Sequence, residues 1–397
     1  SGQPPLRRQR GDMMLQRKHK IAGGVVAVLV ILGTLAVHVA GNKAAGFVNE
    51  MADRQTVLQG KLQIGHFNAS VSGNVVFQDV VWTAPDGKTL AEVPEMNISA
   101  NLFDIVKGSF GINSINSITI EKPKFAVAYT DKDGLDIINY INFSKEEDDK
   151  PTEFRGMVEI EEGALALDMN GQKLDFDSVQ MQANLKEFPS INFTLQGKNG
   201  DADLIGSIDK KYDDVNIGAE VKNLQITELM KVLPSFGDLK ITGGVINGAK
   251  LTSSLHDAKW KLNLDGSLAG VAAQVLGYNI SDGGGSFAID NDAATFTGVS
   301  GKVEGQDVNM DGKIIFQDLG MPTYDLNVAA PAFRVDAVSP GLGITDSVNI
   351  NGKVTGPIDE PVINGSFTMD KLEVAPLVAT GINGNYNYTN GLVTLTN

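Results

Sequence analysis

Segments in which every second residue is apolar follow one another from about residue 60 nearly to the end of the chain. This alternation places successive side chains on opposite faces of a strand. Dipeptides that tolerate positive φ punctuate the pattern and predict hairpin turns. They are Asp86-Gly87, Asp133-Gly134, Asn170-Gly171, Asp265-Gly266, Asp311-Gly312 and Asn390-Gly391. The sequence therefore predicts a mainly β chain, an antiparallel meander with one apolar face.

Few helical patterns interrupt the strands. The spacing predicts an amphipathic helix over about 44–59, a second helix over Gly134–Phe143 and a third over Ile226–Leu233. For the third helix, Thr227 is the expected N-cap and Pro234 ends the helix. The charged run between Ser144 and Pro151 predicts a solvated loop, and we place a module boundary there.

An internal repeat runs through the second half of the chain. Residues 224–245 align without a gap onto 333–354, and residues 280–297 align onto 379–396 with a slightly shorter offset. A β unit of roughly 100–110 residues thus occurs at least twice, which favours stacking along an axis over closure into one globule.

Residues 21–40 contain no formal charge and are long enough to cross the hydrocarbon core of a bilayer as one helix. The six basic residues that precede them include Arg17, Lys18 and Lys20, so the positive-inside rule predicts a cytoplasmic N-terminus. A cleaved signal peptide and a buried core helix are the alternatives. The expected domains are a cytoplasmic segment 1–20, a transmembrane helix 21–43, a β module 44–150 and a repetitive β body 151–397.

Composition excludes several classes of site. The chain has no Cys, four scattered His and a net charge of −15, so thiolate chemistry, clustered metal ligation and nucleic-acid binding are not expected. No nucleophile-elbow, zinc-protease or phosphate-loop motif occurs. Asp131, Asp133 and Asp136 have a calcium-like spacing but lack the distal Glu, so a hairpin turn is the preferred interpretation. We expect no enzyme activity, cofactor or metal.

A long sheet with one apolar face and few helices must close on itself, pack on a second sheet, or enclose a ligand. Anchored in a membrane, a trough of this kind suits a phospholipid, because its contacts with acyl chains need no catalytic residue. The candidate lipid-contacting residues are Ile118, Ile120, Phe125, Val127, Leu165, Leu167, Phe176, Ile191, Phe193, Leu195, Leu262, Leu264, Phe287, Ile289, Ile314, Phe316, Leu326 and Val328.

Two sets of motifs resemble a known family. The first set lies between Leu62 and Tyr140 and includes Val80-Val81-Trp82, Met96-Asn97-Ile98-Ser99-Ala100, Asp104-Ile105-Val106-Lys107-Gly108 and Ile118-Thr119-Ile120-Glu121-Lys122-Pro123. The second set spans Asn351–Phe367 and includes Asn351-Gly352-Lys353-Val354, Gly356-Pro357 and Gly365-Ser366-Phe367. The first set resembles the N-terminal module of the AsmA-like family, and the other set is similar to the repeating body of the TamB branch of that family. Together the motifs cover about 44–397.

The resemblance implies an elongated, curved β-groove that is anchored in the inner membrane, crosses the periplasm and moves phospholipids to the outer membrane. It also implies a link to outer-membrane protein assembly with an Omp85-type partner. Members of the family are usually longer, so we expect this chain to be a fragment without the C-terminal domain. Two alternatives remain open: a periplasmic assembly factor that offers a strand edge to β-barrel or autotransporter clients, and a structural β-solenoid with a sealed core.

Overall fold

The computed structural model describes residues 53, 58–70, 72–107, 112–130, 132, 134–140, 154–230, 240–275, 277–316, 321–338, 345–357, 359–374 and 376–396. The predicted anchor at 21–43, its flank Arg17, Lys18 and Lys20, and most of the predicted helix at 44–59 lie outside these residues. None of the helices in the described ranges is long and apolar enough to span a bilayer.

The described residues are mainly strand, with 21 strands and a few short helices, which confirms the predicted β class. They divide into two compact units. The N-terminal unit comprises the described residues up to Gly200 together with Ile205–Val215, and the C-terminal unit comprises Asp201–Leu204 and Asn216–Asn397. Strands β10 (Ala202–Lys211) and β11 (Asp214–Gln225) contain residues of both units. The predicted module boundary at 144–151 lies outside the described residues.

The N-terminal unit is a mixed sheet with three short helical turns. Its strands are β1 (Lys61–Ala69), β2 (Asn74–Thr83), β3 (Thr89–Ala100), β4 (Ile115–Glu121), β5 (Lys124–Thr130), β6 (Gly134–Leu135), β7 (Met157–Met169), β8 (Gln172–Asn184) and β9 (Ile191–Asn199). Its helical turns are α3 (Leu102–Lys107), the 3₁₀ turn η1 (Ile112–Ser114) and α4 (Asp136–Asn139). Helix α4 and β6 together replace the single helix that was predicted over Gly134–Phe143.

Two parallel pairings correct the expectation of a purely antiparallel meander. Strands β4 and β5 run in series between β3 and β7, antiparallel to β3 and parallel to β7. The break between them falls at Lys122-Pro123, because Pro123 has no N–H to give to the sheet. Lys122 takes φ 50°, and Glu162 takes φ 52° at a register shift in β7 opposite the break. The backbone N–H of Lys122 donates to the carbonyl of Glu161 at 2.8 Å, so the two irregularities fit together.

A closed hydrophobic core lies in the N-terminal unit. It gathers buried side chains from β1, β2, β3, β4 and β7, with Phe77, Leu90 and Met96 wholly buried. The indole N–H of Trp82 donates to the carbonyl of Gln59 at 3.0 Å, which satisfies its one polar group. This unit therefore has a sealed interior of the kind expected for an ordinary small domain.

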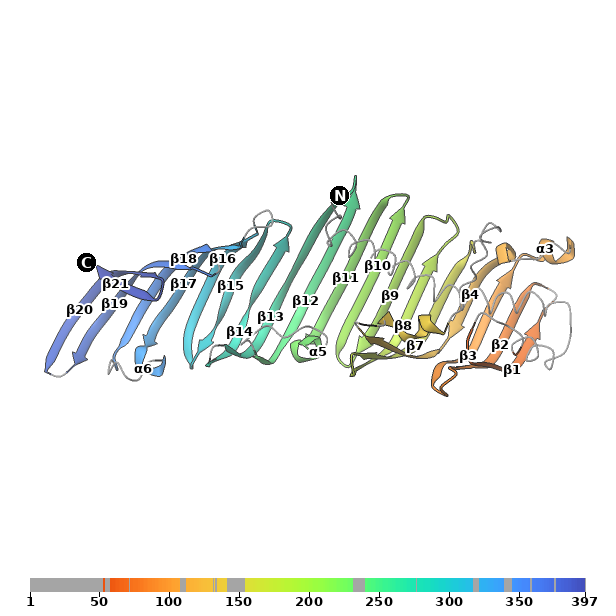
Figure 1. Cartoon of the computed structure of the whole chain (residues 1–397), viewed down its shortest axis with the longest axis horizontal. Helices are drawn as coiled ribbons and strands as arrows, with labels where there is room; N and C mark the ends of the chain where they lie inside the picture. The colour runs from red at the N-terminus through yellow and green to blue at the C-terminus, as the bar shows by residue number, and fades with distance from the viewer. Residues whose placement is uncertain are drawn as a thin grey trace, which may run out of the picture. The chain divides into compact units, whose positions relative to one another are not determined.

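The C-terminal unit is built of antiparallel strands in chain order. They are β12 (Lys240–His256), β13 (Lys259–Val275), β14 (Tyr278–Asp290), β15 (Ala293–Val303), β16 (Gln306–Ile315), β17 (Thr323–Arg334), β18 (Ser347–Pro357), β19 (Val362–Val374), β20 (Leu377–Thr389) and β21 (Leu392–Thr396). Helix α5 (Ile226–Met230) follows β11 and α6 (Val335–Val338) follows β17. Both helices lie at the same edge of the strands (Figure 1).

The structure confirms the internal repeat in detail. Helices α5 and α6 begin at Ile226 and Val335, which are aligned residues of the two copies. Asn223 and Ala332 take φ 55° and 49° at matching positions shortly before these helices. In the second pair of segments, Asp282 and Gly381 are aligned and take φ 54° and 65°. The copies therefore share their irregular positions as well as their strands.

The turn predictions divide into two groups. Asp86-Gly87, Asn170-Gly171 and Asn390-Gly391 lie in turns. Gly134 pairs with Thr130 at the start of β6, and Asp133 lies outside the described residues. Asp265-Gly266 and Asp311-Gly312 do not form turns, because they lie inside β13 and β16. A Cβ on Gly266 would lie 2.7 Å from Cζ of Phe287, and one on Gly312 would overlap the carbonyl of Asp325. These two glycines thus allow neighbouring strands to approach each other closely, and they do not form turns.

Candidate functional site: an apolar sheet face

The register of the C-terminal unit defines one apolar face. Directly paired residues of antiparallel strands point to the same side of a sheet. A single row of paired residues crosses every strand from β12 to β21 and contains only apolar side chains, tyrosine and glycine. We call it the central row: Ala249, Gly266, Phe287, Phe296, Gly312, Leu326, Val354, Ile363, Tyr388 and Val393.

The next row along the strands lies on the opposite face and is mostly polar. It contains Lys250, Asp265, Ala288, Thr295, Lys313, Asp325, Thr355 and Val362. Lys353, on this same face, pairs with Asp325 at 3.0 Å. The two faces of the unit thus differ sharply in chemistry, as the alternation in the sequence predicted.

Most side chains of the apolar face are only half-buried. Phe287, Phe296, Val354 and Ile363 are intermediate in exposure, and Leu262 is 37% exposed. Buried exceptions such as Leu326 and Met369 are enclosed among their neighbours, and Ile226 of α5 packs near Gly244. The hydrophobic core cluster contains no residue of this unit. The apolar face is therefore a surface, unlike the interior of the N-terminal unit.

A line of bulges creases this face across β13, β14 and β15. Gly270, Asp282 and Gly298 take φ of 60°, 54° and 59°, each at a shift in register. Bulges bend the strand that carries them. A hollow of about 330 Å³ lies along the crease, and its walls include Leu268, Val271, Ile280, Phe287, Phe296, Val299 and Met310.

Glycines form the floor of the hollow. A Cβ on Gly285 would lie 2.7 Å from Cα of Val299, and one on Gly283 would lie 3.0 Å from Cβ of Val271. The candidate residues chosen from the sequence did not include Val271, Ile280 or Val299. The run Gly283-Gly284-Gly285 within an alternating segment was the available signal, because consecutive glycines in a strand mark a bulge or a close approach.

A larger hollow of about 710 Å³ lies over β16 to β20, mainly on the polar face. Amide and hydroxyl side chains line it, among them Asn309, Asn327, Asn351, Asn364 and Asn385. Asn387 donates to Asn364 across β19 and β20 at 2.8 Å. Desolvating so many amides against a hydrocarbon chain is unfavourable, so this larger hollow does not suit an apolar ligand.

The structure brings the predicted residues of the C-terminal unit together. Leu264, Phe287, Ile289, Ile314, Leu326 and Val328 are joined through paired neighbours on the apolar face, and Leu262 follows the same alternation. Phe316 lies directly after β16 and is 38% exposed.

The predicted residues of the N-terminal unit fall into two groups. Ile118 and Ile120 are 1% and 3% exposed and belong to the closed core, so their placement on an open surface is corrected. The other predicted residues are half-buried or exposed. Phe125, Leu165 and Phe176 form one paired row, Val127 and Leu167 lie beside it, and Ile191, Phe193 and Leu195 lie along β9.

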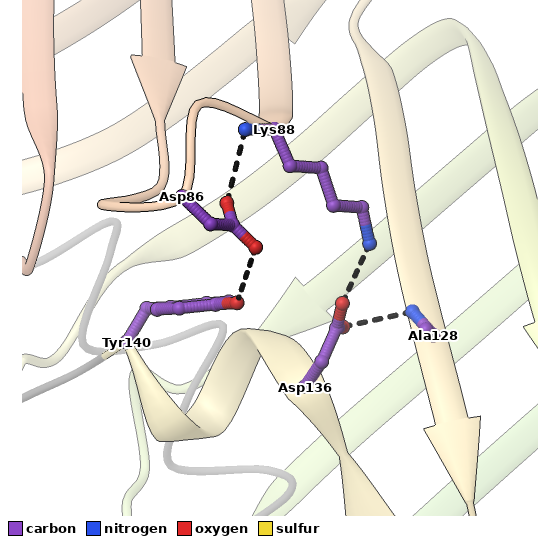
Figure 2. A network of polar contacts seen from close by, with 5 residues as sticks. All are labelled: Asp86, Lys88, Ala128, Asp136 and Tyr140. Carbon is purple, nitrogen blue, oxygen red and sulfur yellow. Dashed lines mark hydrogen bonds and ion pairs between the residues drawn. The ribbon is translucent and has the colours of Figure 1, made fainter.

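A polar network joins α4 to the β2–β3 turn and to β5 (Figure 2). Asp136 accepts a hydrogen bond from the Lys88 ammonium at 2.6 Å and another from the Ala128 N–H at 2.8 Å. Tyr140 donates to Asp86 at 3.4 Å. Partial desolvation, followed by the negative charges of Asp86 and Asp136, raises the pKa of Tyr140 above its ordinary value.

This network accounts for Asp136 of the calcium-like spacing, while Asp131 and Asp133 lie outside the described residues. In the part of the chain that the structure describes, no cluster of acidic and histidine side chains could hold a metal ion. Asp136 thus serves to fix α4 against two neighbouring elements.

Comparisons with family models, curated proteins and solved structures find no match for this chain.

Proposed function

We propose that the chain is a lipid conduit, in which the apolar face of the C-terminal unit carries the acyl chains of phospholipids. The central row is the observation that supports this most directly. It offers hydrocarbon contacts across every strand from β12 to β21 without an intervening charge. At about 4.8 Å per strand the row is about 40 Å long, which exceeds the ~15 Å depth of one leaflet's hydrocarbon.

The energetic need for such a surface is large. Moving two acyl chains of ~16 methylenes each through water costs about 0.8 kcal/mol per methylene, or roughly 25 kcal/mol. A continuous apolar surface lowers this barrier because its contacts are non-directional and can be exchanged one methylene at a time. The hollow at the crease is about twice the size of a ~150 Å³ cavity that accepts a benzene ring.

The proposal includes the setting expected from the sequence. Residues 21–43 anchor the chain in the inner membrane with Arg17, Lys18 and Lys20 on the cytoplasmic side, and the β units lie in the periplasm. Membership of the AsmA-like family and an Omp85-type partner at the outer membrane belong to the same proposal. Their support is the resemblance of the motifs.

Site-specific photo-crosslinking tests the proposal. The photoreactive residue p-benzoylphenylalanine replaces Leu262 on the apolar face or, as a matched control, Asn263, the next residue of β13 on the polar face. The full chain is irradiated with phosphatidylethanolamine vesicles in the presence of an unfolded outer-membrane polypeptide, and adducts are identified by mass spectrometry. We expect phospholipid adducts at position 262 and none at 263.

The other outcomes each contradict the proposal. Adducts to unfolded outer-membrane polypeptides at position 262, in place of lipid, favour an assembly factor. Adducts only to neighbouring strands of the same chain indicate a sealed structural core. Equal phospholipid labelling at positions 262 and 263 indicates non-specific adsorption to the vesicles.

A further inference from the structure

Exposure rises step by step along one row of the N-terminal unit. Met96, Ile120, Ile160, Met181 and Leu195 are consecutive partners on β3, β4, β7, β8 and β9. Their exposed fractions begin at 0% for Met96, 3% for Ile120 and 7% for Ile160. Met181 is half-buried and Leu195 is 38% exposed. One apolar row thus passes from a sealed core to an open surface.

A second row repeats the trend. Ile98, Ile118, Val158, Ala183 and Phe193 are paired in the same order across the same strands. The first three are buried, and Ala183 and Phe193 are half-buried. Both of these neighbouring rows therefore place the change in exposure between β7 and β8.

Side chains from several elements cover the buried parts of the two rows, on the β3, β4 and β7 side of the change in exposure. Phe77, Leu90 and Met96 of β2 and β3 fill the core together with Phe154, which precedes β7, and Leu185, which follows β8. The N–H of Leu185 donates to the carbonyl of Gly156 at 2.9 Å, which fixes the covering segments to each other. From β8 and β9 only partly buried residues, Met181, Ala183 and Ile191, pack against this core.

We infer that acyl chains first contact the N-terminal unit at β8 and β9, beside Met181, Phe193 and Leu195, and that lipid does not enter the closed core formed by β1 to β4 and the start of β7. This inference rests on the proposed conduit and specifies where its cargo enters. A path through this core would require it to open, and re-exposing a few of its large side chains would cost about as much free energy as the whole stability of a typical domain.

Labelling of the unmodified full chain tests the inference. Vesicles of phosphatidylethanolamine contain a small fraction of phosphatidylcholine with a diazirine in one acyl chain, and labelled residues are mapped by tandem mass spectrometry. We expect about tenfold more label at Leu195 than at Ile120, in line with exposures of 38% and 3%. Thr194, exposed on the opposite face of β9, serves as the internal control. The chain unfolded in urea shows that Ile120 can be labelled once it is accessible.

A pair of variants tests whether lipid contact at β8 and β9 depends on the apolar side chain of Leu195. Leu195→Lys is expected to lower labelling of Met181 and Phe193, whereas Thr194→Lys on the opposite face leaves it unchanged. Equal label at Ile120 and Leu195 in the folded chain would overturn the entry point while leaving the conduit supported. Absence of label from the apolar faces of both units would overturn the conduit itself.

Discussion

A single carboxylate should lower the free energy of unfolding far more in the closed core of the N-terminal unit than on the apolar face of the C-terminal unit. Ile118→Asp removes a side chain that is 1% exposed and places a carboxylate in the closed core. Losing the buried side chain costs about 2–5 kcal/mol, and burying an unpaired carboxylate costs several kcal/mol more. The total approaches the ~5–15 kcal/mol stability of a whole domain, so we expect the N-terminal unit to unfold.

Leu262→Asp is the matched change on the open face. Leu262 is 37% exposed, so about two thirds of its ~1.5–3 kcal/mol burial energy is at stake, or roughly 1–2 kcal/mol. The new carboxylate stays in contact with water and adds little further cost. We expect a folded protein whose urea midpoint falls by roughly 0.3–2 M, given a typical slope of ~1–3 kcal/mol per M. Phospholipid labelling of the apolar face should be lost.

Urea unfolding followed by circular dichroism measures both changes. The chain has two tryptophans, Trp82 in the closed core and Trp260 on β13. In a Trp260→Phe background, fluorescence therefore reports on the N-terminal core alone. If Leu262→Asp destabilised the protein as much as Ile118→Asp, another layer would have to cover the apolar face, and that face would not be open.

Three further changes test other parts of the structure. Gly266→Val should cost about 1–3 kcal/mol, since its side chain would overlap the Phe287 ring, and a urea midpoint unchanged from wild type would contradict this. Asp136→Asn should cost about 0.5–1 kcal/mol through loss of the Lys88 ion pair, and the difference from wild type should shrink in 1 M NaCl. The raised pKa of Tyr140 means that the unfolded chain loses its phenolic proton first, so stability should fall as the pH rises past ~10. Tyr140→Phe should show a weaker decline between pH 9 and 11 than wild type, and parallel curves would contradict the assignment.

Local chemistry predicted much of the fold. Period-two alternation located the strands, and Asn170-Gly171 and Asn390-Gly391 form turns in which both residues take positive φ. The same kind of dipeptide failed at Asp265-Gly266, where the glycine is needed because the Phe287 ring lies across it. Turn propensity is a property of the dipeptide itself, whereas that close approach depends on the residue that the neighbouring strand places opposite the glycine.

The alternation in the sequence predicted which residues share the apolar face, but it did not predict how deeply each of them is buried. Ile118 and Leu195 show the same alternation, yet one is buried and the other is exposed, because closure depends on which strands fold over the row. The parallel pairing of β4 and β5 with β7 was also beyond sequence reasoning, since it depends on a crossover that no local signal specifies.

Helices α5 and α6 begin at equivalent positions of the two copies, Ile226 and Val335, so one copy could be removed between these positions. Gln225 and Arg334 end equivalent strands, and an equivalent helix follows each. Joining Gln225 directly to Val335 would therefore preserve the local sequence of elements while removing one full copy. We expect such a shortened protein to fold, with an apolar face in the C-terminal unit that is shorter by the strands of one copy.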